Sequence, residues 1–152
     1  MKVLGNILWH IPFLGFVTAI LYWLLGGLLT ITVIGAPIGL GLIEYSKFLL
    51  WPFGKAMVNK KELNMKQNKA WGTYSTIVRI IYFPFGFILA IVTIFQIVGL
   101  FITLFGIPMA IILAKSLSTI FNPVNKKCVS DAMVNELAQR KAVKELDALK
   151  NA

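Results

Sequence analysis

Acidic residues, histidine and cysteine are all scarce in this sequence. The 152 residues include six Asp and Glu, one His and one Cys, against 15 Lys and Arg. A single cysteine excludes an intramolecular disulfide, and one cysteine with one histidine leaves too few ligands for a structural zinc site. No P-loop, nucleophile-elbow or His-Glu-x-x-His motif occurs. We therefore expect no enzymatic activity and neither a bound metal nor a cofactor.

Charged side chains are also missing from two long stretches, residues 3–53 and 74–121. The charged or histidine side chains within these stretches are few: His10, Glu44, Lys47, Arg79 and Lys115. A composition with 58% hydrophobic and 14% charged residues is too apolar for a soluble domain of this size. Each stretch is long enough for two membrane helices of ~20 residues. The sequence predicts an integral membrane protein whose surroundings are the lipid bilayer.

The positive charges lie at the ends of the apolar stretches, which argues against a nucleic-acid partner. Lysines fill the middle of the chain and follow the second stretch, and the positive-inside rule predicts that both regions are cytoplasmic. Lys2 predicts a cytoplasmic N-terminus in the same way. Contact with anionic lipid headgroups is expected from five of these lysines, namely Lys55, Lys60, Lys61, Lys126 and Lys127.

A short motif occurs twice in the chain. Residues 31–37 read Ile-Thr-Val-Ile-Gly-Ala-Pro, and residues 102–108 read Ile-Thr-Leu-Phe-Gly-Ile-Pro, 71 positions later. The alignment continues without a gap and gives eight identities in 28 positions, among them a glycine, two prolines and a lysine. Bulk hydrophobicity does not place these residue types in register. We interpret the chain as two copies of one unit.

The repeat and the charge pattern predict an all-α membrane protein with four transmembrane helices in two tandem, parallel helical hairpins. The first membrane repeat covers residues 1–58 and the second residues 74–129, with a cytoplasmic basic linker at residues 59–73 between them. The expected helices run from about 6 to 25, 28 to 50, 76 to 96 and 100 to 121. Residues 130–152 form a cytoplasmic amphipathic helix.

The outer turn of each hairpin has two candidate positions. A turn at Gly26-Gly27 divides the first apolar stretch into two limbs that both span the bilayer, and it places Gly35 and Pro37 as a break inside the second helix. Gly106 and Pro108 then break the fourth helix. The alternative puts the turn at residues 35–37 and leaves a second limb of about 14 residues, which is too short to span and is re-entrant. We favour the first placement.

Glu44 and Lys115 occupy equivalent positions, seven residues after the repeated proline. A charge that faces lipid costs ~2.5–3.5 kcal/mol, so Glu44 is expected to face protein or water. Parallel repeats place the two side chains at equal depth, and we predict that they form an intramembrane pair or line a pore. Lys47, one turn after Glu44, is a further candidate because its longer side chain reaches the interface.

Several short motifs make the chain resemble the YccF domain family of bacterial inner-membrane proteins. They are the N-terminal Leu4-Gly5-Asn6-Ile7-Leu8-Trp9, the two Gly-x-Pro segments, and the unit ends Trp51-Pro52-Phe53-Gly54 and Asn122-Pro123. The resemblance extends to about residue 129. It implies a location in the bacterial inner membrane, with an acidic residue at position 44 and a basic one at position 115. The resemblance brings no established activity.

Two hypotheses for function follow. The first is a small channel or transporter for a solute or ion, assembled as a homo-oligomer because four helices enclose little space. The second is a non-transporting membrane subunit or scaffold that binds a partner protein through the basic loop and residues 130–152.

Overall fold

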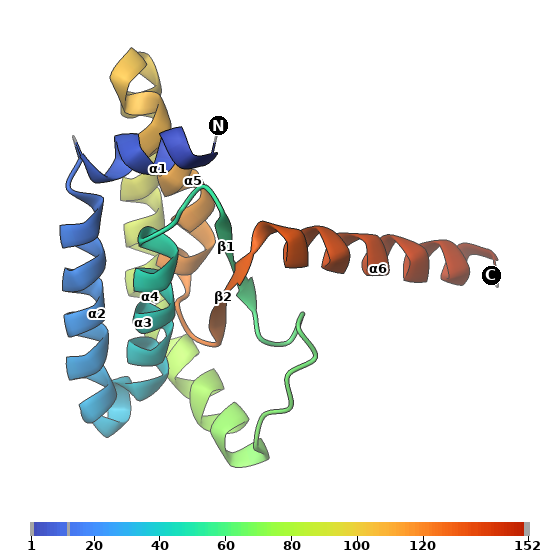
Figure 1. Cartoon of the computed structure of the whole chain (residues 1–152). Helices are drawn as coiled ribbons and strands as arrows, with labels where there is room; N and C mark the ends of the chain where they lie inside the picture. The colour runs from blue at the N-terminus through green and yellow to red at the C-terminus, as the bar shows by residue number, and fades with distance from the viewer. Residues whose placement is uncertain (1, 12, 151–152) are drawn as a thin grey trace.

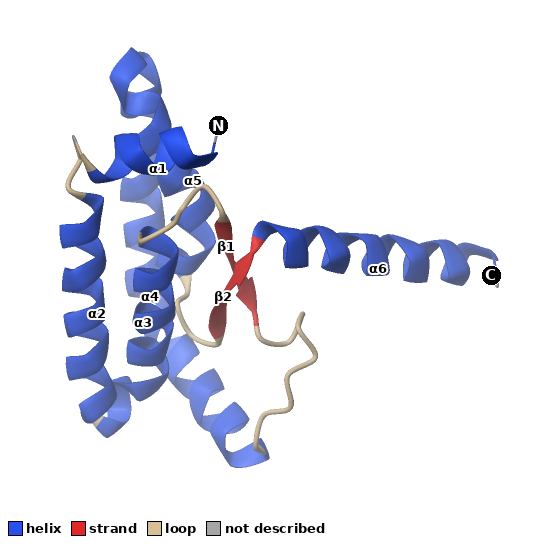
Figure 2. Ribbon diagram, viewed as in Figure 1, coloured by secondary structure: helices blue, strands red, loops and turns tan. Residues whose placement is uncertain are grey.

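The computed structural model describes residues 2–11 and 13–150, most of which are helical. The helices are α1 (Lys2–His10), α2 (Gly15–Ile31), α3 (Ala36–Leu49), α4 (Lys69–Ile102), α5 (Ile107–Phe121) and α6 (Asp131–Lys150). Two short 3-10 turns, η1 (Val33–Gly35) and η2 (Leu104–Gly106), precede α3 and α5. Two strands, β1 (Lys55–Asn59) and β2 (Lys126–Ser130), complete the fold (Figures 1 and 2).

The apolar helices form two hairpins, in which α2 packs against α3 and α4 against α5. The turn between α2 and α3 lies at one end of the molecule and the turn between α4 and α5 at the other (Figure 1). The prediction of two parallel hairpins is therefore wrong, because the second hairpin is inverted relative to the first. The lysines that follow each apolar stretch favour a parallel orientation, but the first of them, Lys55 and Lys126, lie in two strands that pair with each other.

The predicted outer turn at Gly26-Gly27 is also wrong. Both glycines lie inside α2, and the chain turns at η1, so that Pro37 is in the first turn of α3. A Cβ on Gly26 would lie 2.8 Å from the carbonyl oxygen of Gly39. Gly26 thus allows two antiparallel helices to approach closely, as small residues do in membranes. The alternative turn at residues 35–37 is the one observed, and α3 has the 14 residues it implied.

The helices differ in length from the four similar spans that were expected. At 34 residues α4 is about 51 Å long, more than a bilayer requires, and it is the one described helix that is long and apolar enough to cross alone. The α1 and α2 helices pass the same test together but are bent by 75°. The apolar α5 helix has 15 residues. Four membrane-spanning helices therefore stay a prediction.

The sequence reading missed the two strands. They pair antiparallel with Met57 opposite Cys128 at the centre of the register. These two residues are 71 positions apart, as are the first residues of η1 and η2, of α3 and α5, and of β1 and β2. The element order of the first half thus recurs in the second. The expected basic linker at 59–73 is shortened to residues 60–68 by β1 and by the early start of α4.

Buried side chains fill the space between the hairpins and the strands. Phe48 and Leu49 of α3 and Ile112 of α5 are almost completely buried, with Trp9 of α1 beside them. By contrast, α2 and α4 expose most of their large apolar side chains, which suits a lipid surrounding. The expected C-terminal helix is present as α6. It projects away from the helices and buries none of its residues.

Candidate functional site

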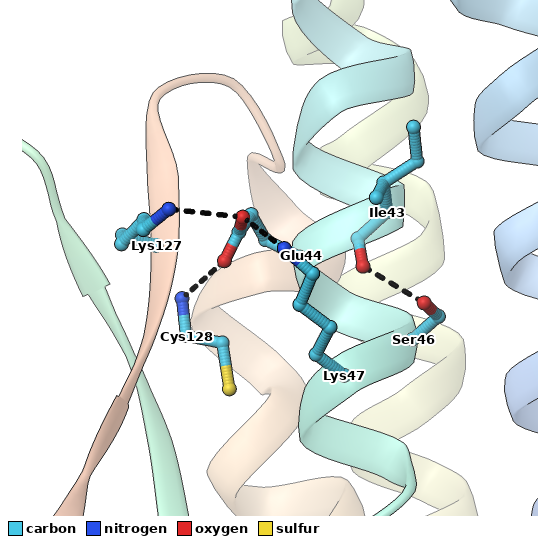
Figure 3. Close-up of polar contacts among 6 residues, drawn as sticks. All are labelled: Ile43, Glu44, Ser46, Lys47, Lys127 and Cys128. Carbon is cyan, nitrogen blue, oxygen red and sulfur yellow. Dashed lines mark hydrogen bonds and ion pairs between the residues drawn. The ribbon is translucent and has the colours of Figure 1, made fainter.

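Glu44 lies between α3 and β2, where its carboxylate accepts three hydrogen bonds (Figure 3). Its Oε1 atom accepts from Lys47 Nζ at 2.8 Å and from Lys127 Nζ at 3.2 Å. Its Oε2 atom accepts from the backbone N–H of Cys128 at 3.0 Å. The side chain is 12% exposed. The expectation that Glu44 faces protein is met by a strand of the other half of the chain.

This arrangement suits a carboxylate in an apolar stretch of the chain. Charge-assisted hydrogen bonds are shorter and stronger than neutral ones, and a nearly buried carboxylate is stabilised only when its oxygens are paired. Two lysines share one carboxylate, so the cluster carries an excess of positive charge. The backbone bond to Cys128 additionally fixes β2 against α3.

Lys115 lies on α5 and contacts the segment that follows α3. Its Nζ donates to the carbonyl oxygen of Pro52 at 3.0 Å and lies 3.6 Å from Asp131 Oδ1. The other oxygen of Asp131 is 3.2 Å from Lys2 Nζ. Lys115 is also 5.9 Å from the centre of the Phe48 ring, within reach of a cation–π contact.

Glu44 and Lys115 therefore do not pair with each other, contrary to the prediction. Each holds the other half of the chain instead: Glu44 binds β2, and Lys115 binds the carbonyl of Pro52 just before β1. The predicted pair required parallel hairpins, which place the two residues at equal depth. In the inverted arrangement, equivalent residues of α3 and α5 face opposite strands.

The four Gly-x-Pro residues are brought to the hairpin turns rather than to the middle of helices. A Cβ on Gly35 would lie 2.7 Å from Thr32 Oγ1, and one on Gly106 would lie 2.4 Å from Thr103 Oγ1. The glycines are needed for this close approach. Pro37 and Pro108 occupy the first turns of α3 and α5, where a missing N–H costs nothing.

The five lysines expected to contact anionic lipid differ in their exposure. Lys61 is exposed, while Lys55, Lys60 and Lys127 are half-buried on or next to the strands. Lys126 contradicts the expectation, because it is 7% exposed and its Nζ donates to Ser118 Oγ at 3.2 Å. Burial lowers the pKa of Lys126, the nearby Arg79 lowers it further, and Glu62 opposes the shift.

The role of α1 was not apparent from the sequence. The indole N–H of Trp9 donates to the carbonyl oxygen of Leu49 at 2.8 Å, and the backbone N–H of Phe53 donates to Asn6 Oδ1 at 3.2 Å. These contacts fasten α1 to the end of α3. Within the described ranges, no three His, Cys, Asp or Glu side chains are placed to hold a metal ion. The site is an ionic and hydrogen-bonding cluster.

Comparison with known proteins gives one informative match. Residues 4–55 match the model of the YccF family, described as an inner membrane component domain. The matched range covers α1 to α3 and ends where β1 begins, so it includes Glu44 and stops short of Lys115. Neither the curated proteins nor the solved structures gave a match. Over residues 4–55 the chain is thus similar to an inner membrane component domain, and its apolar helices suit a membrane protein.

Proposed function

We propose that the protein is an oligomeric channel or transporter for a small solute or ion. The observation that carries the proposal is the position of the strand pair. Figure 1 places β1 and β2 beside the middle of the hairpin helices. Backbone with unpaired hydrogen-bonding groups is tolerated at membrane depth only where it is buried in protein or lines a water-filled space.

The strand pair has open edges, because each described strand has one neighbour in a two-stranded sheet. The charged groups around it include Lys47, Lys127 and Glu44, and the lysine side chains are 50% and 38% exposed. Lipid cannot solvate such a face, whereas α2 and α4 expose apolar side chains that lipid covers well. An oligomer in which the polar faces of several copies surround a shared aqueous space solvates these polar faces with water. The apolar faces of α2 and α4 then remain in contact with lipid.

The inverted order of the hairpins supports the same function. Many transporters are built from inverted structural repeats, with short or broken helices at the interface between them. Here α3 and α5 are the short helices, and each carries one charged residue that contacts the other half of the chain. The internal duplication inferred from the sequence, together with the inverted hairpins, supports such an architecture.

Flux measurements in proteoliposomes test the proposal. We expect the purified protein to pass at least one of a small anion, a small cation and a small neutral solute. Lys127→Met, which removes a positive charge from β2, lowers anion flux relative to cation flux if ions are carried. Lys144→Met on the exposed α6 is the matched control and leaves flux unchanged. Absence of flux for every solute from folded, oligomeric protein contradicts the proposal.

The alternative, a non-transporting subunit that binds a partner protein, is favoured by α6. This helix exposes Met133, Val143, Leu146 and Leu149 and projects from the body. If α6 is a docking element, removing residues 131–152 abolishes co-purification of a partner while residues 1–130 stay folded. A truncated protein that loses flux but no partner favours the transporter instead.

A further inference from the structure

A cavity of about 290 Å³ lies between the two hairpins. Thr18 and Tyr22 line it from α2, Tyr45 and Leu49 from α3, and Trp9 from α1. The second hairpin contributes Leu89, Val92, Thr93 and Gln96 of α4, and Met109, Ile112, Leu113 and Ile120 of α5. The cavity is separate from the Glu44 cluster, whose residues do not line it.

Equivalent residues of the two halves line this cavity together. Thr18 and Leu89, Tyr22 and Thr93, and Leu49 and Ile120 are each 71 positions apart, and all six line it. Met57 and Cys128, which pair at the centre of the strand register, have the same separation. The cavity therefore lies where the inverted halves meet, which is the place at which inverted-repeat transporters bind their substrates.

The chemistry of the lining defines the class of ligand. No Asp, Glu, Lys or Arg is among the described residues that line the cavity, and aromatic and aliphatic side chains dominate. Thr93 Oγ1 donates to the carbonyl of Leu89 at 2.7 Å and is thereby satisfied within its helix. The Tyr22 hydroxyl and the Gln96 amide make no hydrogen bond within the part of the chain described here, and both are available to a ligand. A charged ligand has no counter-charge in this cavity.

We propose that this cavity binds an uncharged, mainly apolar molecule that carries a single hydrogen-bonding group. The inference deepens the proposed function, on which it rests, by naming the class of solute. Access is from the bilayer between α2 and α4, because Leu89 and Val92 line the cavity and are still 47% and 48% exposed. Two sources supply this chemistry: a small neutral alcohol from solution, and the acyl chain of a membrane lipid together with its ester carbonyl.

Trp9 provides a direct readout, because bromine quenches indole fluorescence on contact and Trp9 is a buried lining residue. The background protein carries Trp23→Phe, Trp51→Phe and Trp71→Phe, so that Trp9 is the one tryptophan left and its indole emission is recorded. It is reconstituted in phosphatidylcholine vesicles and titrated with 4-bromobenzyl alcohol, with the anion 4-bromobenzoate as the charged analogue. In a second arm, the vesicles contain phosphatidylcholine with brominated acyl chains and receive no added alcohol.

A cavity-filling substitution and a matched control complete the design. Thr93→Phe fills the cavity from a side chain that is 5% exposed. Thr76→Phe makes the same change at an exposed position of the same helix, where the native hydroxyl also donates to a carbonyl of its own helix. The melting temperature of each variant shows that it is folded.

We expect saturable quenching by the neutral alcohol, with half-saturation at roughly tenfold higher concentration in Thr93→Phe and unchanged in Thr76→Phe. Quenching by brominated chains that Thr93→Phe removes identifies the acyl chain as the ligand. Quenching that does not saturate, that is equal for 4-bromobenzoate, or that Thr93→Phe leaves unchanged overturns the proposal. The assay does not depend on flux. If the protein transports a solute but shows none of this quenching, the proposed ligand site in the cavity is refuted and the transport function is not.

Discussion

At the scale of single residues, Glu44 shows how a charge is held in an apolar chain. The carboxylate accepts from one lysine of its own helix, one lysine of β2 and one backbone N–H of β2. The two bonds to β2 connect positions more than 80 residues apart. Glu44 therefore stabilises the contact between the two halves of the chain in addition to its own helix.

Glu44→Ala is expected to destabilise the protein by about 1–3 kcal/mol, because it leaves the Cys128 N–H without its acceptor in a protected position. Glu44→Gln costs less, since the amide oxygen still accepts that hydrogen bond. Unfolding in a mixed-micelle denaturant titration, followed by circular dichroism, measures both values.

Lys47→Met is the control for Glu44, because the lysine side chain is 50% exposed and its ion pair is worth little. If Glu44→Ala and Lys47→Met have equal effects, the bonds from β2 contribute nothing. If Glu44→Ala leaves the free energy of unfolding unchanged, the arrangement in Figure 3 is contradicted.

The sequence identified Glu44 correctly as a residue that needs polar partners, because a carboxylate in an apolar stretch has few alternatives. It did not identify the partners. The pairing with Lys115 depended on equal depth in parallel hairpins, and hydropathy contains no information on the relative direction of two hairpins. The backbone N–H of Cys128 carries no residue-type signal at all.

At the scale of elements, the strand pair is the feature that the residue composition predicts least well. The five residues of each strand contain one or two lysines and no alternating apolar pattern, so they resemble a basic loop. The repeat itself offered the missing signal. Equivalent segments of two inverted units can meet around a twofold axis, and an antiparallel strand pair has that symmetry.

Met57→Cys is expected to form a disulfide with Cys128 under mild oxidation. Directly opposed residues of an antiparallel pair have Cα atoms about 4.5–5.5 Å apart, within the range that a disulfide spans. Val58→Cys is the control, because its side chain points to the other face of the sheet. Non-reducing electrophoresis after cleavage in the loop at residues 60–68 detects the cross-link.

The rate of this cross-linking has a defined pH dependence. Burial raises the pKa of the Cys128 thiol, with lesser contributions of both signs from nearby charges. Because the thiolate is the reactive form, the reaction is slow near neutral pH. It continues to accelerate at pH values where an exposed thiol has levelled off. A rate that levels off at the same pH as a small-molecule thiol contradicts burial of Cys128.

The turn positions were decided by two competing signals. Equal limb lengths favoured Gly26-Gly27, while local chemistry favoured residues 32–37, where Thr32, Gly35 and Pro37 form a tight turn and begin a helix. The local chemistry prevailed, because the requirement for equal spans does not apply to a short helix that packs on another. The glycines inside α2 serve helix packing instead.

At the scale of the whole molecule, the opposite directions of the two hairpins determine which residues face each side of the membrane. The Tyr74 hydroxyl donates to the carbonyl of Val33, which places the α2–α3 turn next to the N-terminal end of α4. That end follows a lysine-rich loop, and the positive-inside rule predicts that it is cytoplasmic. The α4–α5 turn is then expected on the other side.

Cysteine labelling tests this arrangement in cells that express variants in a Cys128→Ser background. A single cysteine at Leu104→Cys, in a turn where the leucine is 80% exposed, is expected to react with a membrane-impermeant maleimide added outside. One at Ile34→Cys, where the isoleucine is 77% exposed, is expected to react only after the membrane is permeabilised. Equal labelling of both cysteines from one side contradicts the inverted arrangement and supports the parallel hairpins predicted from the sequence.

The large sequence separation of the Glu44 contacts also bears on how the protein is made. Lys127 and Cys128 follow Glu44 by 83 and 84 residues. N-terminal segments leave the ribosome first, so α3 reaches the membrane long before β2 has been synthesised. During that interval Lys47, three residues away on the same helix, is the partner within immediate reach of the carboxylate. We therefore expect the weak pair between Glu44 and Lys47 to compensate the carboxylate charge until the second half of the chain has been synthesised.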